Sequence, residues 1–178
     1  MKHFFKLTCA AAMLTAGLIT LSSFNHSEKK ETTADSYVIS FLSKTQEGSN
    51  YVWMWTLQNP NPGNGNNGTL QDVSHWDIPL TLQAEAALIS AEYSLDGGVT
   101  WTSVSPEMDR DPSVRLCCTS DVLKFNVGTT GMDVNYYRLV FNEDFDANPN
   151  ATSIIKTGGG LKGCNWYTYT GVGGLRQD

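Results

Sequence analysis

The chain has 178 residues, of which 40% are hydrophobic and 17% are charged, with 12 Lys and Arg against 18 Asp and Glu. This length is typical of one domain with a single core. A net charge of −6 lacks the basic footprint that binding to a phosphate backbone needs, so we expect no nucleic acid partner. Ordinary apolar content without an internal repeat excludes a solenoid, a collagen and a wholly disordered chain.

The N-terminus has the three parts of a secretory signal peptide. Lys2 and Lys6 precede an uncharged, apolar run over 7–21, which ends at small residues from Ser22 onward. The run is shorter than the roughly 20 residues that a permanent membrane span requires. We therefore expect residues 1–22 to be removed and the mature protein to be secreted or periplasmic, not membrane-spanning.

The mature chain is predicted to be all-β. Residues 23–35 are polar and aperiodic, which is typical of a flexible lead-in, and a domain is expected over 36–178. Short segments rich in β-branched and aromatic residues alternate there with turn-forming clusters, a pattern typical of a single antiparallel β-sandwich of about eight or nine strands. The expected strands are 36–42, 51–58, 87–95, 99–105, 114–118, 121–127, 134–142, 151–157 and 165–170. One short helix is possible within 80–91, which is rich in Ala, Leu, Gln and Glu.

The segment 51–58 (YVWMWTLQ) is apolar on both faces, which predicts a central strand. On one face Tyr51, Trp53, Trp55 and Leu57 follow each other at every second position. Large aromatic side chains normally fill a core, and we favour that interpretation. The alternative is an exposed row of flat rings that stacks on carbohydrate.

The loop 59–68 (NPNPGNGNNG) contains no apolar side chain other than proline and no ionisable group. Its Asn-Gly steps favour positive φ and its prolines cannot join a strand ladder, so an irregular surface connection is expected. Long polar loops on rigid scaffolds often carry function, but a low-complexity spacer is the interpretation we favour here.

Three cysteines remain after removal of the leader, namely Cys117, Cys118 and Cys164. Outside the cytosol, one pair is expected to be oxidised. If Cys117 and Cys118 lie in a strand, one turns inward to pair with Cys164 while the other faces outward. Either of the two can be the partner, and closing the loop stabilises the fold by about 4 kcal/mol in the chain-entropy treatment.

The segment 94–101 reads SLDGGVTW and fills every specified position of the pattern S-x-D-x-G-x-T-W. It resembles the Asp-box of sialidases and related propellers, in which the box is a structural hairpin away from the catalytic centre. The resemblance covers eight residues, occurs once, and implies a hairpin without an activity. The residues that carry it are Ser94, Asp96, Gly98, Thr100 and Trp101.

Ser74, His75, Trp76 and Asp77 follow the polar loop, and a Gly-rich segment (GGGLKGCNWYTYTG) comes late in the chain. Together they resemble a loose group of secreted proteins without assigned activity that carry a Ser-His-Trp step, which implies a shared β-rich fold. In a strand His75 and Asp77 share one face, where the pair can bind a ligand, act as a base or metal ligand, or form a structural hydrogen bond. We single out His75, Trp76 and Asp77 as ligand-binding candidates.

We expect no cofactor, except that a calcium ion is possible. Glu143, Asp144 and Asp146 offer several carboxylate oxygens in a short acidic loop, whereas a solvated turn is the simpler interpretation. His75 is the one histidine in the predicted domain, which excludes a multi-histidine zinc site. The G-x-S-x-G elbow of a serine hydrolase and the Lys-Ser/Thr of a P-loop are missing.

We therefore expect a secreted binding or accessory module rather than an enzyme, with an extracellular carbohydrate or protein as its ligand. One alternative is an extracellular glycan hydrolase that uses two carboxylates brought together by folding. Another is a structural component of a surface assembly.

Overall fold

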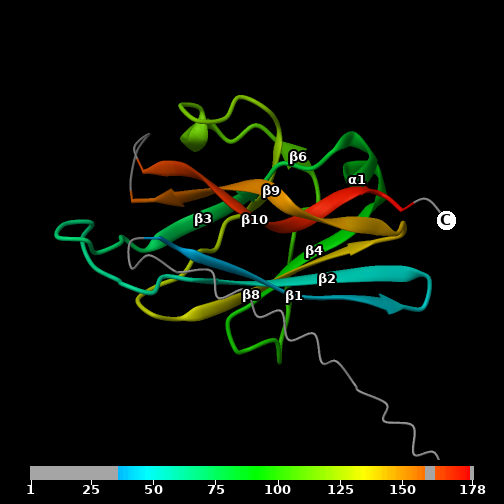
Figure 1. Ribbon diagram of the computed structural model, residues 1–178, viewed down its shortest axis with the longest axis horizontal. Helices are drawn as coiled ribbons and strands as arrows, with labels where there is room; N and C mark the ends of the chain where they lie inside the picture. The colour runs from blue at the N-terminus through cyan, green and yellow to red at the C-terminus, as the bar shows by residue number, and fades with distance from the viewer. Residues whose placement is uncertain (1–35, 159–162, 177–178) are drawn as a thin grey trace, which may run out of the picture. The chain divides into compact units, whose positions relative to one another are not determined.

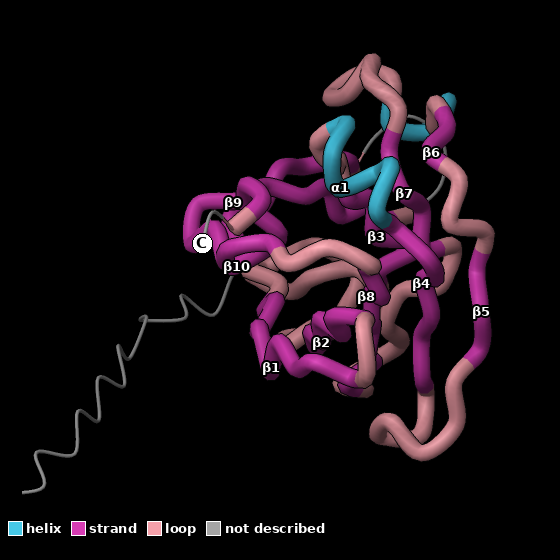
Figure 2. The backbone as a smooth tube through the Cα atoms, turned by 90° about the vertical axis from the view of Figure 1, so that its right-hand side faces the viewer, coloured by secondary structure: helices cyan, strands magenta, loops and turns pink. Residues whose placement is uncertain are grey.

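The structure is a computed structural model that describes residues 36–158 and 163–176. The predicted signal peptide over 1–22 and the lead-in over 23–35 lie outside these residues. The described part forms two five-stranded antiparallel sheets, which confirms the predicted β-sandwich (Figures 1 and 2). The first sheet runs, in spatial order, through β1 (Val38–Glu47), β2 (Asn50–Gln58), β8 (Val134–Phe141), β4 (Leu88–Ser94) and β5 (Thr102–Val104). The second runs through β10 (Cys164–Leu175), β9 (Phe145–Thr157), β3 (Val73–Ile78), β7 (Val122–Phe125) and β6 (Met108–Asp109).

Aromatic side chains fill the space between the sheets, as predicted for the 51–58 segment. Trp53 and Trp55 of β2 have no solvent exposure, and β2 lies between β1 and β8. Trp55 meets Trp76 of the opposite sheet edge-to-face at 6.3 Å, and Trp76 meets Tyr137 at 5.0 Å. Such ring contacts add to the free energy that area burial alone supplies.

The predicted strand over 114–118 is wrong. A 3₁₀ helix, η1 (Pro112–Val114), runs into this stretch. Beyond it, Cys117 and Cys118 donate their backbone N–H groups to the carbonyl of Val114. The cause lies just upstream, because the Asp111 side chain accepts from the backbone N–H of Ser113 and caps the helix. The short helix expected within 80–91 is α1 (Leu82–Ala87). Strands β3 and β6 were not among the expected ones.

Strands β4 and β5 pair antiparallel, and the turn between them is held by side chains. Asp96 accepts hydrogen bonds from the backbone N–H groups of Val99 and Thr100 and from the Thr100 hydroxyl at 2.6 Å. Gly98 has a φ of 87°, which a residue with a Cβ rarely adopts. These donors lower the pKa of the exposed Asp96 carboxyl to about 2, the Thr100 hydroxyl contributing most. The guanidinium carbon of Arg138 lies over the Trp101 ring, 4.2 Å from the ring centroid.

The outer face of the second sheet carries a smaller core of its own. The segment between β6 and β7 packs on it, and the disulfide Cys117–Cys164 joins this segment to β10. The predicted disulfide is confirmed, with Cys117 as the partner. The expectation that the unpaired cysteine faces outward is wrong, because Cys118 is buried beside Val122 and Ile154.

Among the described residues, none of the helices has the length and apolar character that a membrane span requires.

Candidate functional site

Strand β3 places alternate side chains in opposite environments. Trp76 points into the aromatic core, where its indole N–H donates to the Ser153 hydroxyl at 2.7 Å. His75 and Asp77 therefore point to the other face of the sheet, beneath the segment between β6 and β7. Both are nevertheless buried, His75 at 4% exposure and Asp77 at 0%. All three predicted ligand-binding residues are thus inside the protein rather than on its surface.

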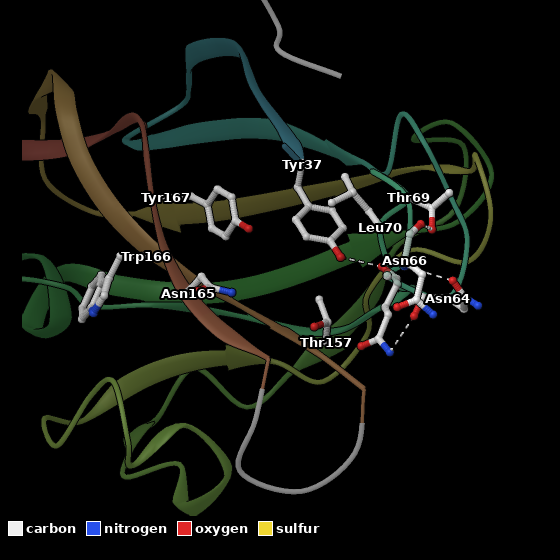
Figure 3. A pocket seen from close by; sticks show the side chains of 11 residues that line it. Tyr37, Asn64, Asn66, Thr69, Leu70, Thr157, Asn165, Trp166 and Tyr167 are labelled. Atoms are coloured by element: carbon white, nitrogen blue, oxygen red, sulfur yellow. Dashed lines mark hydrogen bonds between the residues drawn. The ribbon is translucent and has the colours of Figure 1, made fainter. Parts of the chain in front are cut away.

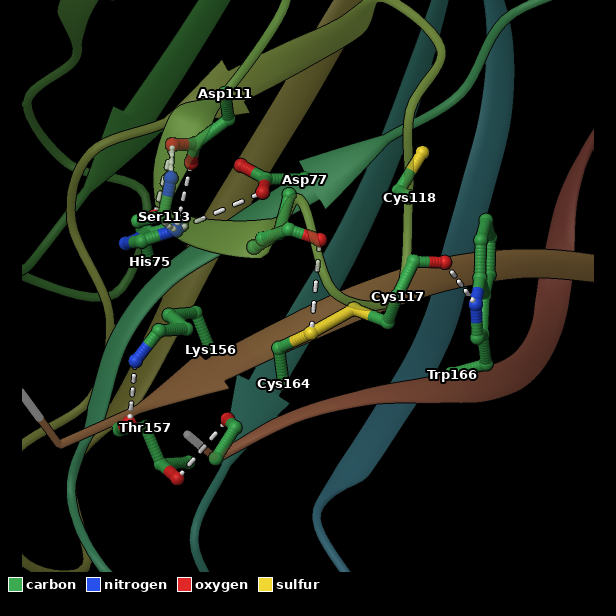
Figure 4. The surroundings of a disulfide bond; sticks show 12 residues. His75, Asp77, Asp111, Ser113, Cys117, Cys118, Lys156, Thr157, Cys164 and Trp166 are labelled. Carbon is green, nitrogen blue, oxygen red and sulfur yellow. Dashed lines mark hydrogen bonds and ion pairs between the residues drawn. A yellow bond between two sulfur atoms is a disulfide. The ribbon is translucent and has the colours of Figure 1, made fainter. Parts of the chain in front are cut away.

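His75 and Asp77 belong to a buried charged cluster, shown in Figure 4. The Nε2 atom of His75 lies 2.9 Å from Oδ2 of Asp111 and 3.6 Å from Oδ2 of Asp77. Lys124 of β7 places its ammonium 2.8 Å from the same Oδ2 of Asp111. The hydroxyl of Ser113 lies 3.2 Å from His75 Nε2 and donates to Oδ1 of Asp111 at 2.8 Å. Three separate segments of the chain, namely β3, the start of η1 and β7, therefore meet in this cluster.

Burial and mutual charge separate the pKa values of this cluster. Burial, followed by the positive charge of Lys124, lowers the pKa of His75 to about 4. Burial, followed by the negative charge of Asp111, raises the pKa of Asp77 to about 8. Burial also opposes ionisation of Asp111, but the Lys124 ammonium and the Ser113 donors outweigh it and hold the pKa of Asp111 well below its usual range. At neutral pH the cluster therefore combines a neutral imidazole, a neutral Asp77 and an ionised Asp111.

The geometry does not match a Ser-His-Asp triad. In a triad the nucleophile and the carboxylate occupy opposite nitrogens of the imidazole. Here Ser113 and Asp111 both lie at Nε2, whereas Nδ1 lies 3.3 Å from the Ser74 hydroxyl. Ser113 also donates to Asp111 rather than being held for attack on a substrate. The cluster is therefore not arranged to activate a serine.

A separate pocket of about 650 Å³, shown in Figure 3, is lined by residues of the polar loop and of β9 and β10. Two tyrosine rings, Tyr37 and Tyr167, meet edge-to-face at 5.7 Å on one side of it. Burial is the main reason that the pKa of Tyr37 rises to about 12 and that the pKa of Tyr167 rises, so both hydroxyls remain protonated. The remaining lining is Asn64, Gly65, Asn66, Thr69, Leu70, Gln71, Thr157, Asn165 and Trp166. None of these lining residues carries a charge at neutral pH.

The polar loop that we interpreted as a spacer forms one wall of this pocket. Its backbone is fixed by its own amide side chains, since Asn64 Oδ1 accepts from the N–H of Asn66 and Asn59 donates to the carbonyls of Leu70 and Gln71. Asn59 has no solvent exposure, so it anchors the loop to the sandwich. A loop fixed in this way presents its amide groups to a ligand at little cost in conformational entropy.

The carboxylates considered for calcium are either held in ion pairs or exposed to solvent. Asp144, in the turn between β8 and β9, forms ion pairs with Lys44 and Arg176. Glu143 and Asp146 are exposed, and Asp146 lies in β9. Within the described residues, the metal-competent group of His, Cys, Asp and Glu side chains is instead His75, Asp77 and Asp111.

Sequence reasoning missed most of both sites. Asp111, Ser113 and Lys124 were not among the residues singled out from the sequence. The signal available in the sequence was the capping pattern Asp111-Pro112-Ser113, which marks a helix start and not a strand. For the pocket, the signal was the density of Asn-Gly and Asn-Pro steps, which self-order through Asx turns.

Comparison of the chain with models of protein families, with curated proteins and with solved structures finds no match.

Proposed function

We propose that the protein is an exported, non-enzymatic binding module that recognises an uncharged carbohydrate in the pocket between Tyr37, Tyr167 and the 59–71 segment. The observation that carries the proposal is the pocket lining, in which the partly exposed ring of Tyr167, backed by the buried ring of Tyr37, adjoins several amide and hydroxyl groups, and none of the described lining residues is charged. The Cys117–Cys164 disulfide supports the export part, because disulfides persist outside the reducing cytosol.

Carbohydrates suit this lining for chemical reasons. A sugar ring offers apolar C–H faces, which pack on aromatic rings, and a rim of hydroxyls, which both donate and accept hydrogen bonds. Asn and Gln side chains also donate and accept, so they complement such a rim without an ion. An open pocket of this size suits a short oligosaccharide rather than a deeply enclosed small molecule.

The test is a glycan array followed by calorimetric titration with the strongest neutral glycan found. We expect Tyr167→Ala to weaken binding by about tenfold or more, because it removes one of the two rings. Tyr167→Phe keeps the ring and is expected to retain most of the affinity. Asn165→Ala removes an exposed amide of the lining and is expected to weaken binding with little effect on folding.

Thr168→Ala is the matched control, since this exposed residue neighbours Tyr167 in β10 but is not part of the lining. It should bind as the wild type does. Absence of binding to every neutral glycan, or equal loss in Thr168→Ala and Tyr167→Ala, contradicts the proposal. Turnover of a bound glycan would favour the hydrolase alternative instead.

A further inference from the structure

We propose that His75, Asp77 and Asp111 form a binding site for one divalent transition-metal ion of the zinc class, independent of the carbohydrate pocket. Their ligand atoms lie within 4.8 Å of one another, and all three residues are buried. His75 and Asp77 belong to β3, and Asp111 caps η1. A bound ion therefore joins the second sheet to the segment that covers it.

The first observation is that neither oxygen of the buried Asp77 side chain has a hydrogen-bond partner. Oδ2 of Asp111, by contrast, is paired with the Lys124 ammonium. A buried carboxylate without a donor is costly and rare in native proteins. The two carboxylates nevertheless face the same imidazole nitrogen (Figure 4). Once Asp77 has lost its proton, carboxylate oxygens from two residues and one imidazole nitrogen converge on a single point, an arrangement that suits a cation.

The kind of donor atom selects the class of metal. One imidazole nitrogen with two carboxylates suits zinc, manganese, iron or cobalt, whereas calcium requires six to eight oxygens. The second ring nitrogen of His75 lies 3.3 Å from the Ser74 hydroxyl, which orients the ring as outer partners of metal-bound histidines do. Ser113, 3.2 Å from Nε2, stands where it can hold a metal-bound water.

Lys124 occupies the approach to the site. A pocket of about 190 Å³, here the approach pocket, is lined by Asp111 and Lys124 together with Asp109, Arg110 and Pro112. The Lys124 side chain is one-third exposed, so its ammonium can leave Asp111 for solvent when the ion enters. Asp77 releases its proton to solvent as the ion binds, and the charges of the two carboxylates then balance those of the ion. Lys156, a further nearby cation, donates to the carbonyls of Thr157 and Gly158.

The experiment is titration of the full chain, stripped with chelator, with Zn²⁺ followed by melting temperature, and with Co²⁺ followed by its visible spectrum. We expect one equivalent to raise the melting temperature and Co²⁺ to give the intense bands of a low-symmetry, four- or five-coordinate site. Asp77→Asn should weaken binding about 100-fold. Lys124→Gln should strengthen it about tenfold or more, because it removes a competing cation. A purely structural ion pair would not show this gain.

Asp109→Asn is the matched control, because this exposed carboxylate lines the approach pocket but is not one of the three ligands. It should leave the affinity unchanged. His26→Ala checks that binding does not come from the lead-in. The proposal is overturned if neither the wild type nor Lys124→Gln responds to metal, or if Asp77→Asn and Asp109→Asn change the affinity equally.

Discussion

Lys156 and Thr157 are neighbours in β9, yet they belong to two different environments. Lys156 is 1% exposed and contributes its charge to the His75 cluster, while Thr157 helps to line the open pocket. The cluster is buried and built from ionisable groups, and the pocket is open and built from amides and phenols. The difference teaches that one strand can support a pH-sensitive interior and a pH-insensitive surface, because alternate residues face opposite sides of the sheet.

The largest expected effect concerns the segment between β6 and β7, which covers the His75 cluster. The disulfide Cys117–Cys164 closes a loop with a sequence separation of 47, which corresponds to about 4 kcal/mol in the chain-entropy treatment. The double variant Cys117→Ser/Cys164→Ser should lose about 2–4 kcal/mol of unfolding free energy, measured with urea. Reduction of the wild type should give a similar loss. A double variant within about 0.5 kcal/mol of the wild type would show that the cover is held without the disulfide.

The second effect is a pH dependence from Asp77, measured with chelator present. Its pKa is raised to about 8 in the folded state, where burial favours the neutral acid, against about 4 when unfolded. Between these values the folded state holds a proton that the unfolded state has released, so stability falls as pH rises. His75, lowered to about 4, gives the opposite slope below its unfolded pKa of about 6.5.

The two slopes therefore oppose each other in acid, and the Asp77 slope stands alone between about pH 6.5 and 8. The wild type should lose about 1 kcal/mol per pH unit in that window, and Asp77→Asn should remove the loss. Asp109→Asn is the control that should keep it. A wild type whose unfolding free energy is flat from pH 6.5 to 8 would contradict the raised pKa.

A third effect tests the hydrogen bonds inside the cluster. Ser113→Ala removes the hydroxyl that donates to Asp111 and is expected to lower the unfolding free energy by about 1.5 kcal/mol, as for other hydrogen bonds to charged groups. Ser103→Ala, at an exposed position in β5, should change it by less than about 0.5 kcal/mol. Equal effects of the two variants would remove Ser113 from the cluster.

The smallest effect on stability concerns the pocket wall. Asn64→Ala removes the acceptor for the Asn66 N–H and should lower the unfolding free energy by about 0.5–1 kcal/mol. Asn148→Ala removes the same kind of bond, from Asn150 N–H at 3.0 Å, outside the pocket. The two variants should unfold alike, but only Asn64→Ala should weaken glycan binding. Weakened binding in both would mean that the loop geometry does not matter.

The sequence predicted the aromatic core better than either site, for a physical reason. Alternation placed Trp53 and Trp55 on one face of a strand, and their hydrophobicity left one plausible location for that face. The same alternation put His75 beside Asp77, but it did not indicate that a separate segment would bury them. Lys124 and Asp111 come from positions far away in the chain. Pairing of β7 with β3 sets Lys124 opposite Asp77, and the fold of the 110–121 segment brings Asp111 to His75. Tertiary contacts of this kind leave no local pattern.

The two cysteine expectations divide in the same way. Pairing with Cys164 followed from the compartment and from the count of thiols. The outward position of the other cysteine assumed a strand at 114–118, and the Asp111 cap replaced that strand with a 3₁₀ helix and a turn.

The most direct test of the proposed function is an amide ¹H–¹⁵N NMR titration of the protein with the strongest neutral glycan from the array, at pH 6 and pH 8. The account predicts shifts concentrated at Asn64, Gln71, Asn165 and Tyr167, with the same dissociation constant at both pH values, because none of the described lining residues titrates between them. Shifts centred on another surface, or an affinity that changes tenfold between the two pH values, would contradict it.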